Sequence, residues 1–328
     1  MSELVSALDM YNSKQLGENL HYEYKWNTNI DEKIVQLYFQ LVRLQSKESI
    51  NNLADNFMET FISAKNKDKK ILLLKILLNT RDIIDGKGEK AISFAILHKL
   101  SFVEPNVTKV IIKSFVISDS SHPIGSWADI KNMWHSFEWT IDFERFFIKL
   151  INDQLKKDIG SKNISLVAKW IPRETNKHKH LFKKLAESYY EHYIISAKSN
   201  DSIIKAKRKA YTNYKRIVTD LSKKLDVTQI KQCGQRYKDI NYNNVTSITM
   251  SKQKNAFLNK KQDKSDDRIQ GAKNFKDFID MNIKLKKEFK GKRVSNYDFI
   301  KDAVNYNNST IKNKDIENIL NSQWKDSE

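Results

Sequence analysis

The chain is poor in the residues that build turns and covalent cross-links. It has one cysteine in 328 residues, which excludes an intramolecular disulfide framework and fits a reducing compartment. Its 8 glycines and 3 prolines leave little material for the tight turns of a many-stranded sheet. Hydrophobic residues still make up 40% of the chain, enough to bury a core. The composition therefore predicts an all-α protein.

Long apolar runs are also missing. The longest, such as residues 71–78, are far too short to cross a bilayer. The amino terminus has no basic stretch followed by an apolar core, so it does not have the pattern of a secretory signal. We therefore expect a cytoplasmic protein.

Enzymatic motifs are absent from the sequence. The histidines form no His-Glu-x-x-His frame, Cys233 has no second cysteine to share a metal with, and there is no Gly-x-Ser-x-Gly elbow. We predict that the chain is not an enzyme and that it has no catalytic residue, metal or cofactor. His98 lies on an apolar helical segment and is expected at the edge of the core. The histidines are His21, His98, His122, His135, His178, His180 and His192.

Helical periodicity begins at Glu32 and continues along the chain. Helix starts recur at intervals of roughly 16 to 21 residues, so a helix pair takes roughly 35 to 40 residues, close to the period of HEAT-type arrays, although no sequence repeat accompanies it. The expected helices cover 48–64, 68–82, 88–101, 106–118, 126–137, 141–158, 178–198 and 201–224, followed by 275–289, 296–304 and 312–324. Residues 241–249 are expected to be a loop or a short extended piece.

The same pattern predicts four parts. Residues 1–30 form an amino-terminal extension, 31–258 a helical-repeat domain, 259–271 an exposed polar linker, and 272–328 a carboxyl-terminal helical segment that packs on the repeats. Spacing within the last expected helix can bury one face, through Ile316, Ile319, Leu320 and Trp324.

Residues 81–90 read Arg-Asp-Ile-Ile-Asp-Gly-Lys-Gly-Glu-Lys. Gly86 and Gly88 flank Lys87 just before a helical segment, as in a phosphate-binding loop. Such a loop requires Ser or Thr after the lysine, and Gly88 stands there instead. We therefore favour a helix that ends with Gly86 in the left-handed conformation and a new helix that opens at Gly88, over direct phosphate contact.

Two further phrases follow, Ile-Gly-Ser-Trp-Ala-Asp at 124–129 and Ala-Lys-Trp-Ile-Pro-Arg-Glu at 168–174. In this order and spacing, the three phrases resemble the TROVE-like helical region of a family of uncharacterised plant and giant-virus proteins. Members of that family usually also carry a carboxyl-terminal von Willebrand factor A domain. The resemblance covers roughly residues 30 to 325. Trp127 and Trp134 are expected to be packing residues.

The resemblance implies a HEAT-like α-solenoid whose antiparallel helix pairs curve, as in a ring. It also implies an RNA partner, because TROVE proteins bind small noncoding and misfolded RNAs. The chain stops about where the A domain should begin, and the Asp-x-Ser-x-Ser metal motif of that domain is absent. We expect a short form that acts without a metal. The alternatives are a separate protein that supplies the A domain and a split reading frame.

Charge provides an independent reason for a polyanionic partner. The net charge is +18, and residues 173–293 contain the whole excess, with 31 lysines and arginines against 13 acidic residues. Such a surface is typical of nucleic-acid binding, although a basic helix can also be merely solvated. Lysines alternate with His178 and His180, which favours an anion-facing surface over a metal site. The predicted RNA-binding residues are Lys177, Lys179, Lys183, Lys184, Lys205, Arg208, Lys209, Tyr211, Tyr214, Lys215 and Arg216.

Most of these residues recur every three to four positions along the expected helix 201–224, which places its cations on one face. Tyr211 and Tyr214 interleave with them and are candidates to stack on unpaired bases, but aromatic residues at helical spacing usually face inward, so core packing is the favoured alternative. We therefore predict a noncatalytic RNA-binding protein, located in the host cytoplasm or the virion if its source is viral. The rival is a scaffolding protein, such as a virion component, that binds an acidic protein partner.

Overall fold

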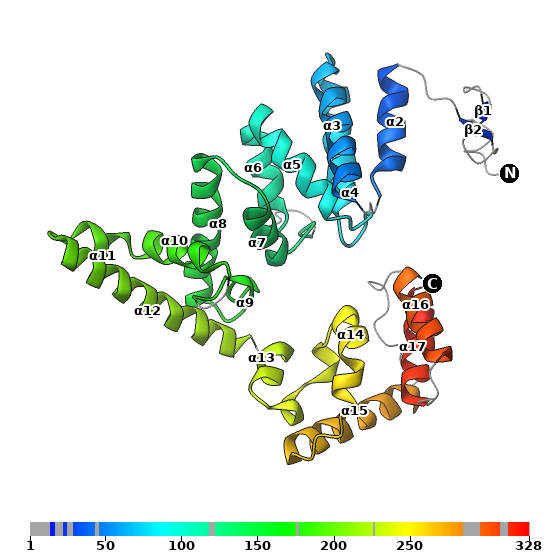
Figure 1. Ribbon diagram of the computed structural model, residues 1–328, viewed down its shortest axis with the longest axis vertical. Helices are drawn as coiled ribbons and strands as arrows, with labels where there is room; N and C mark the ends of the chain where they lie inside the picture. Colours follow the sequence, from blue (N-terminus) through cyan, green and yellow to red (C-terminus); the bar gives the residue numbers. More distant parts are fainter. Residues whose placement is uncertain are drawn as a thin grey trace. The chain divides into compact units, whose positions relative to one another are not determined.

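The computed structural model describes residues 14–16, 22–24, 29–42, 46–117, 122–174, 177–225, 227–284, 296–308 and 314–327. These residues are helical nearly throughout, which confirms the all-α class (Figure 1). The exception is one antiparallel hairpin of two three-residue strands, β1 (Lys14–Leu16) and β2 (Tyr22–Tyr24). Among the described residues, no helix has the length and apolarity needed to span a membrane. Most of the expected extension 1–30 lies outside the described residues.

The chain divides into two compact units, Met1–Val218 and Thr219–Glu328. Helix α12 runs across this division. The helices that begin in the first unit are α2 (Ile30–Gln40), α3 (Lys47–Ser63), α4 (Lys67–Arg81), α5 (Ala91–Val103), α6 (Pro105–Ser114), α7 (Trp127–Ser136), α8 (Ile141–Ile159), α9 (Val167–Trp170), α10 (Lys179–Tyr189), α11 (Glu191–Ile195) and α12 (Asn200–Lys224).

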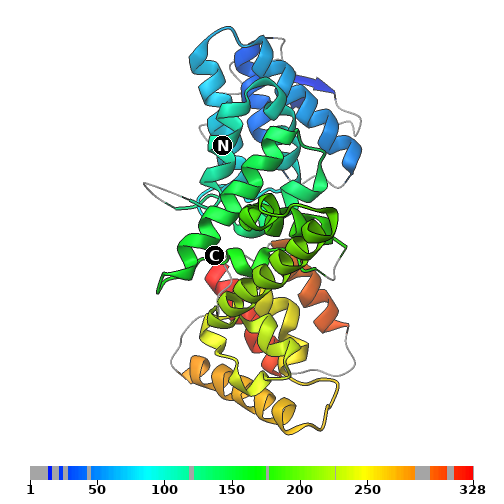
Figure 2. The same cartoon turned by 90° about the vertical axis from the view of Figure 1, so that its left-hand side faces the viewer.

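Helices of the first unit pack mainly on near neighbours in the chain. Helix α3 packs on α4 and α5, α5 packs on α6, and α8 packs on α6, α7, α9 and α10 (Figures 1 and 2). Local signals set the helix starts, since Ser46 accepts the N–H of Ser49 at 3.0 Å and so caps α3. Phe57 and Phe61 lie one turn apart on the buried side of α3.

The expected helix over 178–198 is interrupted at Tyr190, between α10 and α11. No glycine or proline stands at the break. Aromatic contacts accompany it instead, because Tyr189 packs on Tyr214 with ring centroids 5.5 Å apart and Tyr190 stacks on Tyr193 at 5.0 Å. Helical periodicity does not reveal such a break, since its stabilising contacts include a helix that comes later in the chain.

The second unit is a smaller helical cluster with its own core. Its elements are α13 (Thr228–Cys233), the 3-10 helices η1 (Tyr237–Asp239) and η2 (Tyr242–Asn244), α14 (Ser247–Phe257), α15 (Asp266–Lys284), α16 (Asn296–Asn307) and α17 (Lys314–Ser327). Residues 241–249, expected as loop or extended chain, therefore contain η2 and the start of α14. As expected, Ile316 and Ile319 of the last helix are buried, in a cluster with Phe275 and Ile279. The side chain of Trp324 lies outside the described residues.

The expected linker 259–271 differs most from the prediction. From Asp266 onward, this stretch belongs to helix α15. Its polar side chains bind the backbone near Tyr237, about thirty residues earlier in the chain. The Asp267 carboxylate accepts the backbone N–H groups of Tyr237 at 2.7 Å and Lys238 at 3.1 Å. Gly271 lies so close to Tyr237 that an added Cβ would come within 2.6 Å of the Cβ of that residue. Only tertiary contact distinguishes this polar stretch from a solvated linker.

Candidate nucleic-acid interface

The first two sequence phrases meet at a buried ion pair. The Arg81 side chain, at the end of α4, is 1% exposed, and its Nη2 donates to Oδ2 of Asp129, which is fully buried on α7. Ser126 Oγ also donates to that oxygen at 3.0 Å, and Lys90 Nζ lies 3.5 Å from the other carboxylate oxygen. A buried charge that loses its partner is strongly destabilising. The two phrases thus contribute the residues of a buried ion pair that joins α4 to α7.

The loop between α4 and α5 is not a phosphate cradle. The backbone N–H groups of Lys87, Gly88 and Glu89 donate to carbonyl oxygens of the preceding helix end, at 2.8 to 2.9 Å, so they are not available to an anion. Gly88, with φ of 71°, is the left-handed residue, and Gly86 is not. Gly86 is required for a different reason, since an added Cβ would lie 2.0 Å from the carbonyl oxygen of Asn79. The phrase separates two helices, as expected, but the second begins at Ala91 and not at Gly88, and the predicted role of Gly86 is wrong.

Lys87 is also occupied. Its amine donates to the backbone carbonyl of Tyr38 and lies 4.2 Å from the centre of the Tyr38 ring. Burial lowers the pKa of Lys87, while nearby Glu89 raises it. The lysine therefore fastens the loop to α2.

One group in the described part of the chain has the composition of a metal site, namely Asp82, Asp85 and His122. His122 Nε2 lies 3.0 and 2.9 Å from the two Asp82 oxygens, while its Nδ1 faces Asp85 Oδ2 at 3.8 Å. Burial by itself would raise the pKa of Asp82, but hydrogen bonds from the Ile84 N–H, His122 and the Asp85 N–H lower it. The two ring nitrogens face different carboxylates, so the arrangement is that of a histidine that joins two acids.

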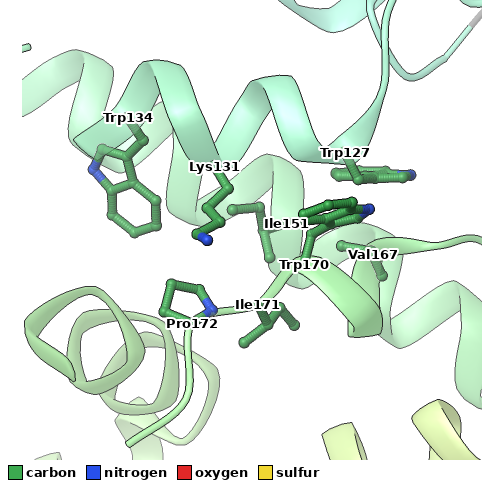
Figure 3. A pocket seen from close by; sticks show the side chains of 8 residues that line it. All are labelled: Trp127, Lys131, Trp134, Ile151, Val167, Trp170, Ile171 and Pro172. Atoms are coloured by element: carbon green, nitrogen blue, oxygen red, sulfur yellow. The ribbon is translucent and has the colours of Figure 1, made fainter. Parts of the chain in front are cut away.

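The second and third phrases meet at a small pocket (Figure 3). Its volume is about 240 Å³, including space open to solvent. Because this volume includes open solvent, the enclosed part is smaller still, well below the roughly 300–1,000 Å³ that holds drug-sized ligands. Trp127 and Trp134 are buried, as predicted. The pocket is lined by Trp127, Lys131, Trp134, Ile151, Val167, Trp170, Ile171 and Pro172.

The predicted basic residues around the start of α10 are exposed. Lys177, Lys179, Lys183 and Lys184 all face solvent. Lys184 pairs with Glu144 of α8 at 2.6 Å. The Lys183 amine lies 5.8 Å from the centre of the Tyr211 ring, which joins this cluster to α12.

Helix α12 separates its charges from its core. Ala210, Tyr214 and Val218 form a buried stripe. At 3.6 residues per turn, the predicted cations project mainly from the opposite side of the helix. The exposed cations are Lys205, Arg208, Lys209, Lys215 and Arg216.

Three cations on that side have neither a counter-ion nor an aromatic ring beside them among the described residues. In the part of the chain that the structure describes, Lys205, Arg208 and Arg216 have no ion-pair partner. Lys215 is 4.0 Å from Glu174, and Lys209 lies 4.5 Å from the centre of the Tyr193 ring. The cations predicted on one face of this helix are thus exposed, and the structure shows which of them have no ion pair among the described residues.

The two predicted stacking residues differ, because Tyr214 is buried and out of reach of bases, whereas Tyr211 is half-buried. Tyr214 is 0% exposed, and its hydroxyl donates to Asn152 Oδ1 at 3.0 Å. Burial raises the pKa of Tyr214 well above its usual value. Tyr211 is half-buried and donates to the Glu187 carboxylate, and burial, followed by that hydrogen bond, raises its pKa. Tyr214 therefore takes the core-packing alternative and not the base-stacking role, because it lies at the centre of the buried stripe.

Other aromatic residues are better placed beside the cations. Tyr190 and Tyr193 are half-buried and stack with ring centroids 5.0 Å apart and planes 10° apart, next to Lys209. The sequence pattern did not single out these two tyrosines, because they lie in a segment expected to be regular helix. The signal was present, since tyrosines at 189, 190 and 193 cluster just before the basic helix.

The geometry defines an all-α protein with a buried ion-pair scaffold and an exposed basic face. Residues 145–327 match the family described as Domain of unknown function (DUF2828), which is more than half of the chain, so the chain belongs to this family. It is also 26% identical over 298 residues to "Uncharacterized protein L728" of Acanthamoeba polyphaga mimivirus. The match covers 82% of this chain and 46% of the viral protein, so the chain spans about half the length of that relative. No solved structure matches.

Proposed function

We propose that this chain is a noncatalytic RNA-binding protein of TROVE-like type, and that it holds the RNA backbone on the exposed face of α12 and the start of α10. The unpaired cations Lys205, Arg208 and Arg216 are the observation that supports this proposal most. One helical turn rises about 5.4 Å, which is close to the separation of successive phosphates on an RNA strand. Cations one turn apart can therefore follow a single backbone.

Unpaired bases would stack at Tyr190 and Tyr193, in place of Tyr211 and Tyr214. A stacking platform beside lysines is the arrangement that binds single strands without strong sequence preference. Phosphate contacts position an RNA but do not specify its sequence. The proposal therefore predicts a preference for unpaired over fully paired RNA, with weak sequence dependence.

The proposal includes a HEAT-like solenoid for the helical region. Packing of α3 to α10 on near neighbours in the chain supports it, because such arrays contact only adjacent repeats. Small-angle scattering of the purified protein is the simplest test. A scattering profile of a globular particle of this mass, without curvature or elongation, would rule out the solenoid.

The function is tested by RNA affinity at several salt concentrations. If about five phosphates are neutralised, log K falls with log salt at a slope of about −3.5. The double variant Arg208→Glu/Arg216→Glu should weaken binding to every RNA tested and make the slope shallower by about 1.4, since two contacts are lost.

A matched control separates the basic face from total charge. Lys65→Glu/Lys75→Glu changes two exposed lysines next to and on α4, and it alters the net charge equally. It should retain most of the affinity. Equal losses in both double variants would show that net charge alone attracts RNA. RNA affinity that is unchanged in both double variants would favour the scaffolding alternative. In that alternative, an acidic protein copurifies with the chain and stays bound after ribonuclease treatment.

A further inference from the structure

The third sequence phrase contributes a partly exposed tryptophan to the small pocket. Trp170 is half-buried, whereas Trp127 and Trp134, which line the same pocket, are only 7% and 3% exposed. Of the described residues that line this pocket, only Lys131 and Trp170 are partly exposed. The open side of the pocket is therefore formed by an amine and an indole ring.

The walls of this pocket come from three segments. Trp127, Lys131 and Trp134 recur at intervals of four and three residues along α7, which puts them on one side of that helix. Ile151 comes from α8, and the segment around the third phrase supplies the remaining wall. Figure 3 shows Lys131 extending from α7 toward that segment. The space is too small for a drug-sized ligand, but a single pyrimidine ring is much smaller than such a ligand.

Two lysines near Trp170 have no counter-ion. Lys169 Nζ lies 5.3 Å from the centre of the Trp170 ring, and Lys131 is the charged residue of the pocket lining. Neither amine has an ion-pair partner in the described part of the chain. Burial lowers the pKa of Lys169. A partly buried amine without a counter-ion is stabilised when an anion comes close to it.

We propose that Trp170 stacks on one unpaired pyrimidine base of a bound RNA strand at the open side of this pocket, and that Lys131 and Lys169 bind the phosphates next to that base. Aromatic side chains beside cations are the arrangement that binds single strands, because a base stacks on the ring while its backbone meets the amines. The ligand is a segment of the same RNA, so the inference rests on the proposed function.

The pocket lies within reach of a strand on the basic face. Glu174, at the end of the third phrase, is 4.0 Å from Lys215 of α12. Trp170 precedes Glu174 by four residues, so their Cα atoms are no more than about 14 Å apart. A strand that contacts Lys215 can therefore place a base at Trp170 a few nucleotides further along.

The test compares the affinity for oligouridine with that for an abasic ribose-phosphate chain of the same length. Trp170→Leu should weaken oligouridine binding by about fivefold to about 150-fold and leave binding of the abasic chain unchanged, because one base stack is lost. Trp170→Phe keeps an aromatic ring and should retain most of the affinity. Phe102→Leu changes a ring of α5 that is 60% exposed and outside the pocket, and it should alter neither affinity.

The two lysines should respond differently, because they bind the backbone and not the base. Lys131→Gln and Lys169→Gln should each weaken the binding of both ligands alike and make the salt slope shallower by about 0.7. This difference separates loss of a stack from loss of a phosphate contact.

Photocrosslinking of the unaltered protein provides a readout that does not depend on how the variants fold. Oligouridine that contains 4-thiouridine should crosslink to Trp170, as located by mass spectrometry. Oligouridine that binds without this crosslink would overturn the pocket proposal and leave the proposed function intact, as would equal losses of both ligands in a folded Trp170→Leu variant. Oligouridine that does not bind at all would overturn both.

Discussion

Arg81 and Arg208 are both arginines of the first unit, but their surroundings are opposite. Arg81 is buried beside Asp129 within the first two sequence phrases, whereas Arg208 is exposed on α12 with no ion-pair partner among the described residues. The buried cation is neutralised and stabilises the fold, so it contributes little to the field outside. The exposed cation contributes little to the fold and remains able to meet a phosphate. The sequence phrases therefore mark the buried ion pair, and the exposed cations of α12 lie outside those phrases.

The largest effect should come from the buried pair. Asp129→Asn leaves the Arg81 charge buried without its counter-ion and should lower the free energy of unfolding by about 3–5 kcal/mol, measured by urea denaturation. Asp85→Asn, at an exposed acid of the adjoining loop, should change it little. The double variant Arg81→Met/Asp129→Leu should recover most of the loss, because it removes both charges. A double variant as unstable as Asp129→Asn would show that shape, and not charge, is decisive here.

Changes at Tyr214 and Tyr190 should have a smaller effect on stability or on RNA affinity. Tyr214→Phe removes the donor to Asn152 Oδ1, leaves a buried acceptor without it, and should cost about 1–3 kcal/mol of stability with unchanged RNA affinity. Tyr190→Leu should do the reverse. It should weaken the binding of single-stranded RNA by about 1–3 kcal/mol per lost stack and leave the binding of duplex RNA unchanged. Equal losses for single strands and duplexes would rule out stacking at Tyr190.

The smallest effect concerns acid stability. Because the folded protein holds the pKa of His135 and His178 below 6.5, the unfolded chain binds protons more readily, and stability falls as the pH drops below about 6.5. The lowered pKa of Asp82 acts only near and below its ordinary value of 3.8, so it does not interfere. Urea denaturation at about pH 7.5 and about pH 5.5 should show this loss, and His135→Gln/His178→Gln should reduce it.

Local patterns were sufficient for several features. Sparse glycine and proline predicted an all-α protein, apolar spacing located most helices of the first unit, and charge counting identified α12 as basic. Trp127 and Trp134 were correctly expected to be packing residues, and His98 to lie at the edge of the core, where it stacks on Phe137 at 4.7 Å. These features depend on composition or on neighbours within one or two helical turns, which a sequence displays directly.

By itself, the sequence determined the helical class and the side of α12 on which its cations lie, because helix geometry projects residues three and four apart onto one face. The tertiary structure decided which of those cations are free, because counter-ions such as Glu174 come from other segments. It also decided that Tyr214 is core, that residues 266–271 begin a helix, and that His135 stacks on His178. Each of these outcomes depends on a partner about thirty or more residues away, and spacing along one helix carries no information about such a partner.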